Sequence, residues 1–165
     1  MASIHKRKFV SSDPEKCVGC CICEYACSFE KEKAFNPVKS RIRSVRLTPL
    51  INMALTCRLC EEAPCVAACP RDALSQSKET GVIIVDEDKC NGCGWCIEAC
   101  DYGAIMIHPD KRVVFVCDLC NGNPKCVEWC PEEALDFVTA DVLAQKARIS
   151  AVKKLFQEAL QQKIE

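Results

Sequence analysis

The segment CVGCCICEYAC, residues 17–27, places five cysteines within eleven residues, and two of them are adjacent. No hydrophobic core requires that density of thiols. The segment CNGCGWCIEAC, residues 90–100, has the same C-x2-C-x2-C-x3-C spacing with one cysteine fewer. In this register Cys21 lies opposite Gly94, so Cys21 is the extra cysteine of the first segment. We therefore interpret the other four as ligands and Cys21 as a small residue beside them.

Two more groups of four cysteines lie at residues 57–69 and 117–130, and a proline follows the last cysteine of each. Their spacings are C-x2-C-x4-C-x3-C-P and C-x2-C-x5-C-x3-C-P. The chain therefore looks like an internal duplication of one unit that contains two cysteine groups. Without Cys21, the four groups contain sixteen of the seventeen cysteines. These sixteen are the candidate ligands: Cys17, Cys20, Cys23 and Cys27; Cys57, Cys60, Cys65 and Cys69; Cys90, Cys93, Cys96 and Cys100; Cys117, Cys120, Cys126 and Cys130.

Cysteine accounts for 17 of 165 residues, a density at which a short secreted chain would be interpreted as a disulfide scaffold. The N-terminal stretch MASIHKRKFVSSDPEK carries positive charge, but no apolar run or small-residue cleavage site follows it, so we expect no signal peptide. The sequence contains no run of about 18 apolar residues, so it predicts no membrane-spanning helix. We therefore expect a cytoplasmic protein with reduced thiols and no disulfide framework.

Zinc and iron-sulfur clusters are the two metal groups that dense C-x2-C motifs can bind. Structural zinc sites usually come as two cysteine pairs, not as a triplet plus one cysteine followed by proline. The C-x2-C-x2-C-x3-C run binds [4Fe-4S] clusters, and its fourth cysteine ligates the other cluster of a pair. Sixteen ligands predict four [4Fe-4S] clusters, which would take the formal net charge from −1 to about −9 when oxidised. We expect Gly19, Gly92 and Gly94 to let the backbone approach these clusters.

Other functions lack a signal in the sequence. Lys and Arg total 22 against 23 Asp and Glu, and no basic stripe interleaved with aromatics predicts nucleic-acid binding. The sequence shows no phosphate-binding loop, dinucleotide fingerprint or nucleophile and base pair, so we expect no catalytic residue and no substrate pocket. We expect His5 and His108 to lie in solvent, and Trp95 and Trp129 to serve ordinary packing.

Between the cysteine groups the sequence predicts short strands and turns. Residues 41–47 and 81–86 read as strands, and residues 104–116 read as a hairpin that turns at 108–111. Each C-x3-C segment predicts one helical turn. After Thr139, apolar residues at helical spacing predict a C-terminal helix that packs on the protein's own surface or on a partner: Val142, Ile149, Val152, Phe156 and Leu160.

With all four groups in view, the sequence resembles the four-cluster iron-sulfur subunits that accompany molybdenum- and tungsten-pterin oxidoreductases, the superfamily of the dimethyl sulfoxide reductase iron-sulfur subunit. The resemblance covers residues 15–138 and all sixteen cysteines. It implies an α+β fold of two bacterial-ferredoxin-like dicluster modules with short strands, hairpins and short helices, plus a C-terminal helix. Residues 1–138 would form the duplicated four-cluster domain, and residues 139–165 would form a C-terminal helical extension.

The resemblance also implies how the cysteines divide among the clusters. In that family each cluster takes three cysteines from one group and one from a partner group, and the first group pairs with the fourth and the second with the third. Carried over, the four sets are Cys17, Cys20, Cys23 with Cys130; Cys117, Cys120, Cys126 with Cys27; Cys57, Cys60, Cys65 with Cys100; and Cys90, Cys93, Cys96 with Cys69. Ser28 and Asp101 depart from the proline that follows the last cysteine in many ferredoxin runs.

In style the chain is most similar to the small subunits of tungsten aldehyde oxidoreductases and of class II benzoyl-CoA reductase. That implies a non-catalytic subunit of anaerobic metabolism that carries electrons between a molybdenum- or tungsten-pterin catalytic subunit and a further ferredoxin or flavin electron-carrier protein. Two alternatives stay open: a free polyferredoxin, and a ferredoxin-like subunit of a cytosolic hydrogenase or formate dehydrogenase complex. A redox or radical enzyme would need an open iron site, and sixteen ligands for four clusters leave no vacancy.

Overall fold

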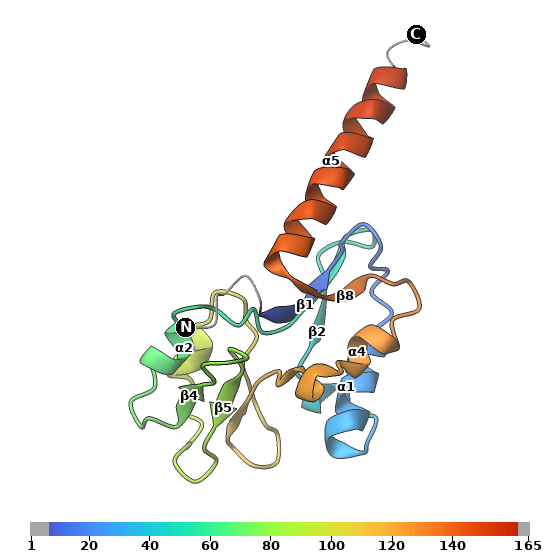
Figure 1. Ribbon diagram of the computed structural model, residues 1–165. Helices are drawn as coiled ribbons and strands as arrows, with labels where there is room; N and C mark the ends of the chain where they lie inside the picture. The colour runs from blue at the N-terminus through green and yellow to red at the C-terminus, as the bar shows by residue number, and fades with distance from the viewer. Residues whose placement is uncertain (1–6, 162–165) are drawn as a thin grey trace.

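The computed structural model describes residues 7–161 of the chain, with side chains up to residue 157. It is a mixed structure of small antiparallel strand pairs and helices (Figure 1), so the expected α+β class is confirmed. The strands are β1 (Lys8–Ser12), β2 (Arg43–Arg46), β3 (Asn52–Leu55), β4 (Leu74–Gln76), β5 (Ile83–Val85), β6 (Met106–Ile107), β7 (Val114–Phe115) and β8 (Leu135–Thr139). The helices are α1 (Ile22–Glu32), α2 (Pro64–Ala67), α3 (Trp95–Glu98), α4 (Lys125–Glu128) and α5 (Ala140–Gln161), with 3-10 turns η2 (Pro37–Lys39) and η3 (Leu119–Gly122).

The strands form three local hairpins and one long-range pair. β2 pairs with β3, β4 with β5 and β6 with β7, all antiparallel. β1 pairs instead with β8, so that Val10 lies opposite Phe137 and the two ends of the cysteine-rich region are joined. The sequence predicted β2, β5 and the β6–β7 hairpin but not the β1–β8 pair, because partners so far apart in the chain leave no local pattern.

Two hydrophobic cores divide the body into two modules. The first module contains the first and fourth cysteine groups, and Val10 and Leu135 lie in its core. The second module contains most of the second and third groups, and Ile83 and Ile105 lie in its core. Cys57 packs against both cores. In the sequence the two-group unit is repeated in tandem. In the fold the second and third groups form one module and the first and fourth form the other, because β8 returns to pair with β1.

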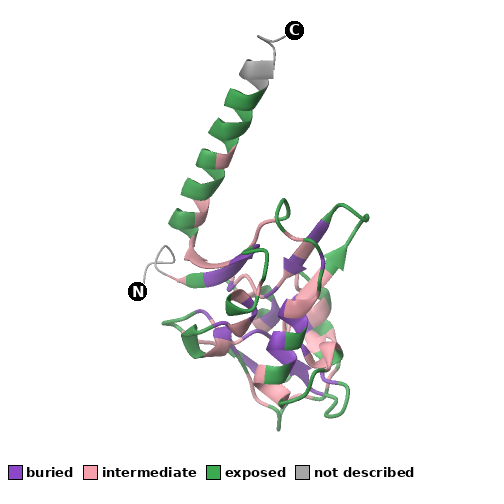
Figure 2. Ribbon diagram, turned by 90° about the vertical axis from the view of Figure 1, so that its right-hand side faces the viewer, coloured by how far each residue is buried: buried purple, intermediate pink, exposed green. Residues whose placement is uncertain are grey.

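Helix α5 leaves the body directly after β8 and projects away from it (Figure 1). Leu143, in its first turns, packs against the core of the first module. Farther along, Ile149 is 48% exposed and Phe156 is 67% exposed, and Figure 2 shows exposed residues along most of the helix. The four described residues of the apolar stripe therefore do not pack on the protein's own surface, which leaves the partner as the expected contact; the side chain of Leu160 lies outside the described residues. No helix within residues 7–161 is long and apolar enough to cross a membrane.

Candidate cluster-binding sites

One small cavity brings the first cysteine group together with the last cysteine of the fourth. Cys17, Cys20, Cys23 and Cys130 all line this cavity, and we call these four residues site A. The first two lie on the loop before α1, Cys23 lies in the first turn of α1, and Cys130 follows α4. The fifth cysteine at the cavity is Cys21.

Two similar cavities lie in the second module, where α2 and α3 are in contact. Each is lined by three cysteines of one group and the last cysteine of the other group. We call these sets site C, which is Cys57, Cys60, Cys65 and Cys100, and site D, which is Cys90, Cys93, Cys96 and Cys69.

The remaining four proposed ligands, Cys27, Cys117, Cys120 and Cys126, form site B; three of them lie in the core of the first module and Cys120 lies beside them. Three are buried, with exposed fractions of 6% for Cys27, 8% for Cys117 and 6% for Cys126. Burial raises the pKa of the Cys126 thiol, and the neighbouring thiols of Cys117, Cys27 and Cys120 raise it further. Contact between α1 and α4 brings Cys27 to Cys126.

Burial raises thiol pKa values at the other sites as well. It raises the pKa of Cys23 in site A to about 12, of Cys57 in site C to about 12 and of Cys96 in site D to about 11. Such thiols stay protonated at neutral pH unless a bound cation displaces the proton. The positive iron core of a cluster supplies that charge, so the donor sets fit [4Fe-4S] groups.

The thiols also surround cavities instead of converging on a point. Among residues 7–161, no three cysteine, histidine or acidic side chains are close enough together to hold a single metal ion. Four thiols around one cavity suit a group larger than one ion, such as an iron-sulfur cube.

A tight turn follows the last cysteine in three of the four groups and directs a backbone N–H at the sulfur. The donors and acceptors are Ala73 to Cys69 Sγ (3.3 Å), Ala104 to Cys100 Sγ (3.4 Å) and Ala134 to Cys130 Sγ (3.3 Å). The residue before each alanine has a left-handed backbone: Asp72 at φ 49°, Gly103 at 58° and Glu133 at 47°. Hydrogen bonds to cluster sulfurs tune the reduction potential. All three groups share the spacing C-x3-A after the last cysteine, and this spacing could have predicted the alanine N–H donors from the sequence.

Cys27 departs from this turn because α1 continues beyond it. Ser28 stands where proline would end the helix, and its fully buried side chain donates a hydrogen bond to the Tyr25 carbonyl over 3.1 Å. The sulfur of Cys27 therefore receives its hydrogen bond from the Arg41 N–H, over 3.2 Å. Of the two departures seen in the sequence, Ser28 changes the local turn, whereas Asp101 leaves it intact.

Two cations and one carboxylate lie beside site B, and the sequence analysis missed them. Asp118 follows Cys117 and accepts hydrogen bonds from Lys31 Nζ and Arg41 Nη1, both over 2.8 Å. It also caps the turn η3 by accepting from the Cys120 N–H over 3.1 Å. Burial acts to raise the pKa of Asp118, but Lys31 and Arg41 lower it more. The three side chains come from separate segments, so no spacing in the sequence marks them.

Gly19 and Gly92 lie at equivalent positions, each with φ near 69°. A Cβ on Gly92 would lie 2.3 Å from the carbonyl oxygen of Arg112, and one on Gly19 would lie 2.6 Å from Asn52 Oδ1. The structure thus gives these two glycines a role in close packing of the cysteine loops against neighbouring hairpins. By contrast, a Cβ on Gly94 would meet nothing within 4 Å.

His108 is buried, with 6% exposed, so the expectation that it lies in solvent is wrong. Its Nδ1 accepts hydrogen bonds from the N–H groups of Asp110 (3.2 Å) and Lys111 (3.3 Å). Its Nε2 lies 3.7 Å from Glu32 Oε1 at the end of α1. The β6–β7 hairpin of the second module thereby packs on the first module. His5 lies outside the described residues.

The two tryptophans differ in environment. Trp95 is 63% exposed, so the expectation that it packs in the ordinary way is wrong. Trp129 stacks with Phe29 at 6.4 Å between ring centroids, and Phe29 in turn stacks with Phe35 at 4.7 Å. Only Trp129 therefore belongs to an aromatic cluster.

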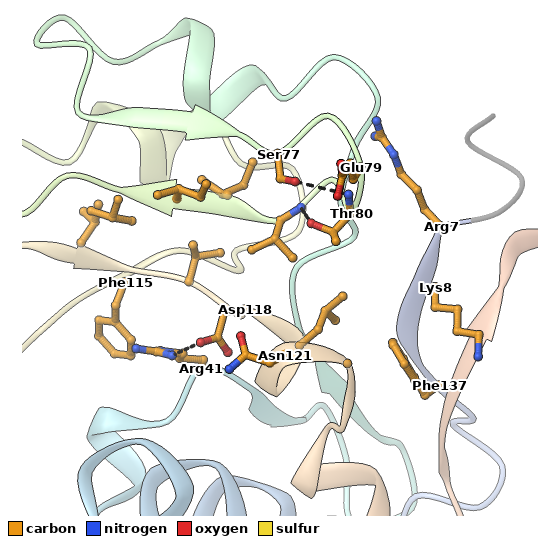
Figure 3. A pocket seen from close by; sticks show the side chains of 18 of the residues that line it. Arg7, Lys8, Arg41, Ser77, Glu79, Thr80, Phe115, Asp118, Asn121 and Phe137 are labelled. Atoms are coloured by element: carbon orange, nitrogen blue, oxygen red, sulfur yellow. Dashed lines mark hydrogen bonds and ion pairs between the residues drawn. The ribbon is translucent and has the colours of Figure 1, made fainter. Parts of the chain in front are cut away.

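A groove of about 690 Å³ lies between the two modules (Figure 3). Its lining contains no cysteine and no histidine, so it is separate from sites A to D. Asp118 lies in it with Arg41 already bound, as Figure 3 shows, and Arg7 and Phe137 lie at the side formed by β1 and β8.

Comparison with known proteins identifies the family. Residues 50–140 match the family described as the 4Fe-4S dicluster domain. The chain is 45% identical over 141 residues to the aliphatic sulfonate oxidoreductase polyferredoxin-like subunit of Pyrococcus furiosus, with 84% of this chain and 82% of that protein covered. It is 34% identical over 175 residues to the electron transport protein HydN of Escherichia coli, with 89% and 95% covered.

A third relative is the thiosulfate reductase electron transfer subunit PhsB of Salmonella typhi, 34% identical over 143 residues, with 78% of this chain and 74% of that protein covered. Among solved structures, the chain is similar to one in the active site complex BamBC of benzoyl coenzyme A reductase as isolated. The TM-score is 0.48 and the identity is 23%, over 86% of this chain and 96% of that chain.

Proposed function

The chain belongs to the 4Fe-4S dicluster domain family of electron-transfer iron-sulfur proteins, and we propose that it holds four [4Fe-4S] clusters, in sites A to D, as the electron-transfer subunit of an oxidoreductase complex. When bound, each cluster supplies one-electron redox chemistry. The chain's own residues ligate the clusters, donate N–H groups to the ligand sulfurs and exclude water from site B.

The observation that carries the proposal is the gathering of cysteines from distant groups. Three cavities are each lined by three cysteines of one group and one of its partner group, and the last such set lies in and beside the core of the first module. These are the ligand sets that the family resemblance implies. The way the two modules bring distant cysteines together therefore supports sixteen ligands in four sites.

The sites lie in the order A, B, C, D. Cys57 of site C packs against both cores, and a thiol of one site adds to the burial that raises the pKa of a thiol in the next, which supports this order. The three linking pairs are Cys23 with Cys126, Cys117 with Cys57, and Cys65 with Cys96. A row of neighbouring clusters allows an electron to move from one end of the chain to the other.

The two ends of the row are open. Cys20 in site A and Cys93 in site D are exposed, whereas no cysteine of site B or site C is. Redox partners can therefore approach the end clusters most closely. We propose a molybdenum- or tungsten-pterin catalytic subunit, of the aldehyde oxidoreductase or benzoyl-CoA reductase type, as one partner and a ferredoxin or flavin protein as the other, in the cytoplasm.

The domain division follows from the same arrangement. We propose that residues 1–138 form the four-cluster unit and that residues 139–165 form a helical extension outside it. The support is that β8 closes the first module against β1, and that α5 begins directly after β8.

Magnetic resonance tests the row of clusters. Dithionite-reduced holoprotein should give a broad, complex electron paramagnetic resonance spectrum, because neighbouring paramagnetic clusters interact through space. Cys57→Ser, which alters a ligand of site C, should simplify the spectrum. If the wild-type spectrum were a simple sum of isolated cluster signals, the sites would be too far apart for the proposed function.

A further inference from the structure

Helix α5 touches the body with one side only. Leu143 packs against the core of the first module. Lys146 Nζ binds Asp136 Oδ2 over 2.6 Å, and Lys154 forms an ion pair with Glu15. With about 100° of rotation per residue, these three residues of α5 span an arc of about 80° that faces the body.

The apolar stripe of α5 lies on another side of the helix, centred about 120° from the arc that faces the body. Val142, Ile149, Val152 and Phe156 fall within an arc of about 80° on a helical projection, centred away from Leu143. Their exposed fractions are 45%, 48%, 51% and 67% in that order. The intervals of seven, three and four residues match the a and d positions of a coiled-coil seam. We call these four residues the α5 stripe.

Basic side chains border the α5 stripe. Lys146 and Lys153 lie along one border and Arg148 along the other, at the positions that flank a coiled-coil seam. Arg148 Nη1 also donates to Gln145 Oε1, the polar residue that interrupts the stripe, over 3.3 Å. The acidic residue at the border is Asp141, in the first turn.

This charge pattern decides between possible occupants. Pairing two copies of α5 in parallel register would bring Arg148 near Lys153 of the other copy, whereas Lys146 is already paired with Asp136 of its own chain. Like charges at these positions oppose pairing, whereas carboxylates on a different helix would attract them. We propose that the α5 stripe is the docking surface for an amphipathic segment of a different protein chain, with an apolar face bordered by Asp and Glu.

A photo-cross-linking experiment identifies what covers the α5 stripe. p-Benzoylphenylalanine is placed at position 152 of the full chain, which is expressed with clusters in its native host and irradiated. The matched control carries it at position 151, outside both the stripe and the arc that faces the body. We expect a cross-link at 152 but not at 151, to an apolar peptide of another protein bordered by carboxylates. A cross-link to a second copy, to a peptide without carboxylates, or equally at both positions would overturn the proposal, as would none at 152.

Charge reversal tests the recognition chemistry on the same cross-linked partner, purified and titrated with holoprotein. The double variant Arg148→Glu and Lys153→Glu should weaken binding at least tenfold, because it places like charges against the partner's carboxylates. Ala147→Glu adds negative charge away from the stripe and should leave binding unchanged. Equal weakening by both variants would overturn the proposal. Iron content should stay the same in all variants, so failure of docking is distinguishable from failure of the four-cluster assignment.

Discussion

Cys21 and Gly94 occupy the same backbone position in the two halves of the chain. Each is the N-cap residue of the helix that carries the third cysteine of its group, and each has a left-handed backbone, with φ of 62° for Cys21 and 90° for Gly94. The Cys21 thiol donates to the Gly19 carbonyl over 3.5 Å. Cys21 is therefore a side chain at a position that favours glycine, beside the cavity of site A.

Cys21→Gly should retain all the iron and should raise the thermal unfolding temperature of the holoprotein slightly. Glycine relieves the left-handed strain, which is worth up to about 1 kcal/mol. Cys20→Ser is the matched change at a proposed ligand, and it should lose or convert one cluster. Iron analysis of both variants checks this. Equal loss of iron would mean that the register of the two halves is wrong.

Gly92→Ala should destabilise the holoprotein more than Gly94→Ala. Both positions have positive φ, which alone costs about 1 kcal/mol for alanine. Only at Gly92 would the added Cβ also collide with backbone, at the carbonyl of Arg112. Anaerobic thermal unfolding followed by cluster absorbance measures the difference. Identical unfolding temperatures for the two variants would show that the hairpin does not constrain this loop.

Asp118→Asn should raise the reduction potential of the cluster in site B, because it removes a negative charge and leaves Lys31 and Arg41 without a carboxylate partner. It should also cost about 2 kcal/mol of stability, the range for hydrogen bonds to charged groups. Glu87→Gln is the control, since the exposed Glu87 and Lys111 pair contributes little. A redox titration followed by magnetic resonance provides the potentials. An unchanged reduction potential at site B would show that the charge of Asp118 does not influence the cluster there.

His108→Leu should destabilise the β6–β7 hairpin by about 1 to 2 kcal/mol, because the N–H groups of Asp110 and Lys111 lose their acceptor. His108→Asn can still accept with its side-chain oxygen and should cost less. Hydrogen exchange of the β6–β7 hairpin would report the difference. Faster exchange in His108→Asn than in His108→Leu would contradict the acceptor role.

The sequence predicted those features that short-range spacing encodes. The C-x3-C spacing placed helical turns at Cys23, Cys65, Cys96 and Cys126, and the alternation of apolar residues placed the β6–β7 hairpin. The helix after Thr139 began where its N-terminal signals indicated. Each of these depends on residues a few positions apart.

The features that the sequence did not predict depend on contacts between distant segments. The β1–β8 pair joins the two ends of the cysteine-rich region, and the cluster of Lys31, Arg41 and Asp118 draws on three separate segments. His108 lies in a polar turn of the sequence but is buried in the structure, with Nε2 near Glu32 at the end of α1. The direction of the α5 stripe depends on which side of the helix meets the body, which hydrophobic spacing alone does not encode.

The proposed function requires that the chain carries four [4Fe-4S] clusters. Iron, acid-labile sulfide and zinc per chain, measured on protein purified without oxygen, test it most directly. The ligand sets predict about sixteen iron, about sixteen sulfide and only traces of zinc. Stoichiometric zinc, or iron near half that amount in fully reconstituted protein, would contradict the claim.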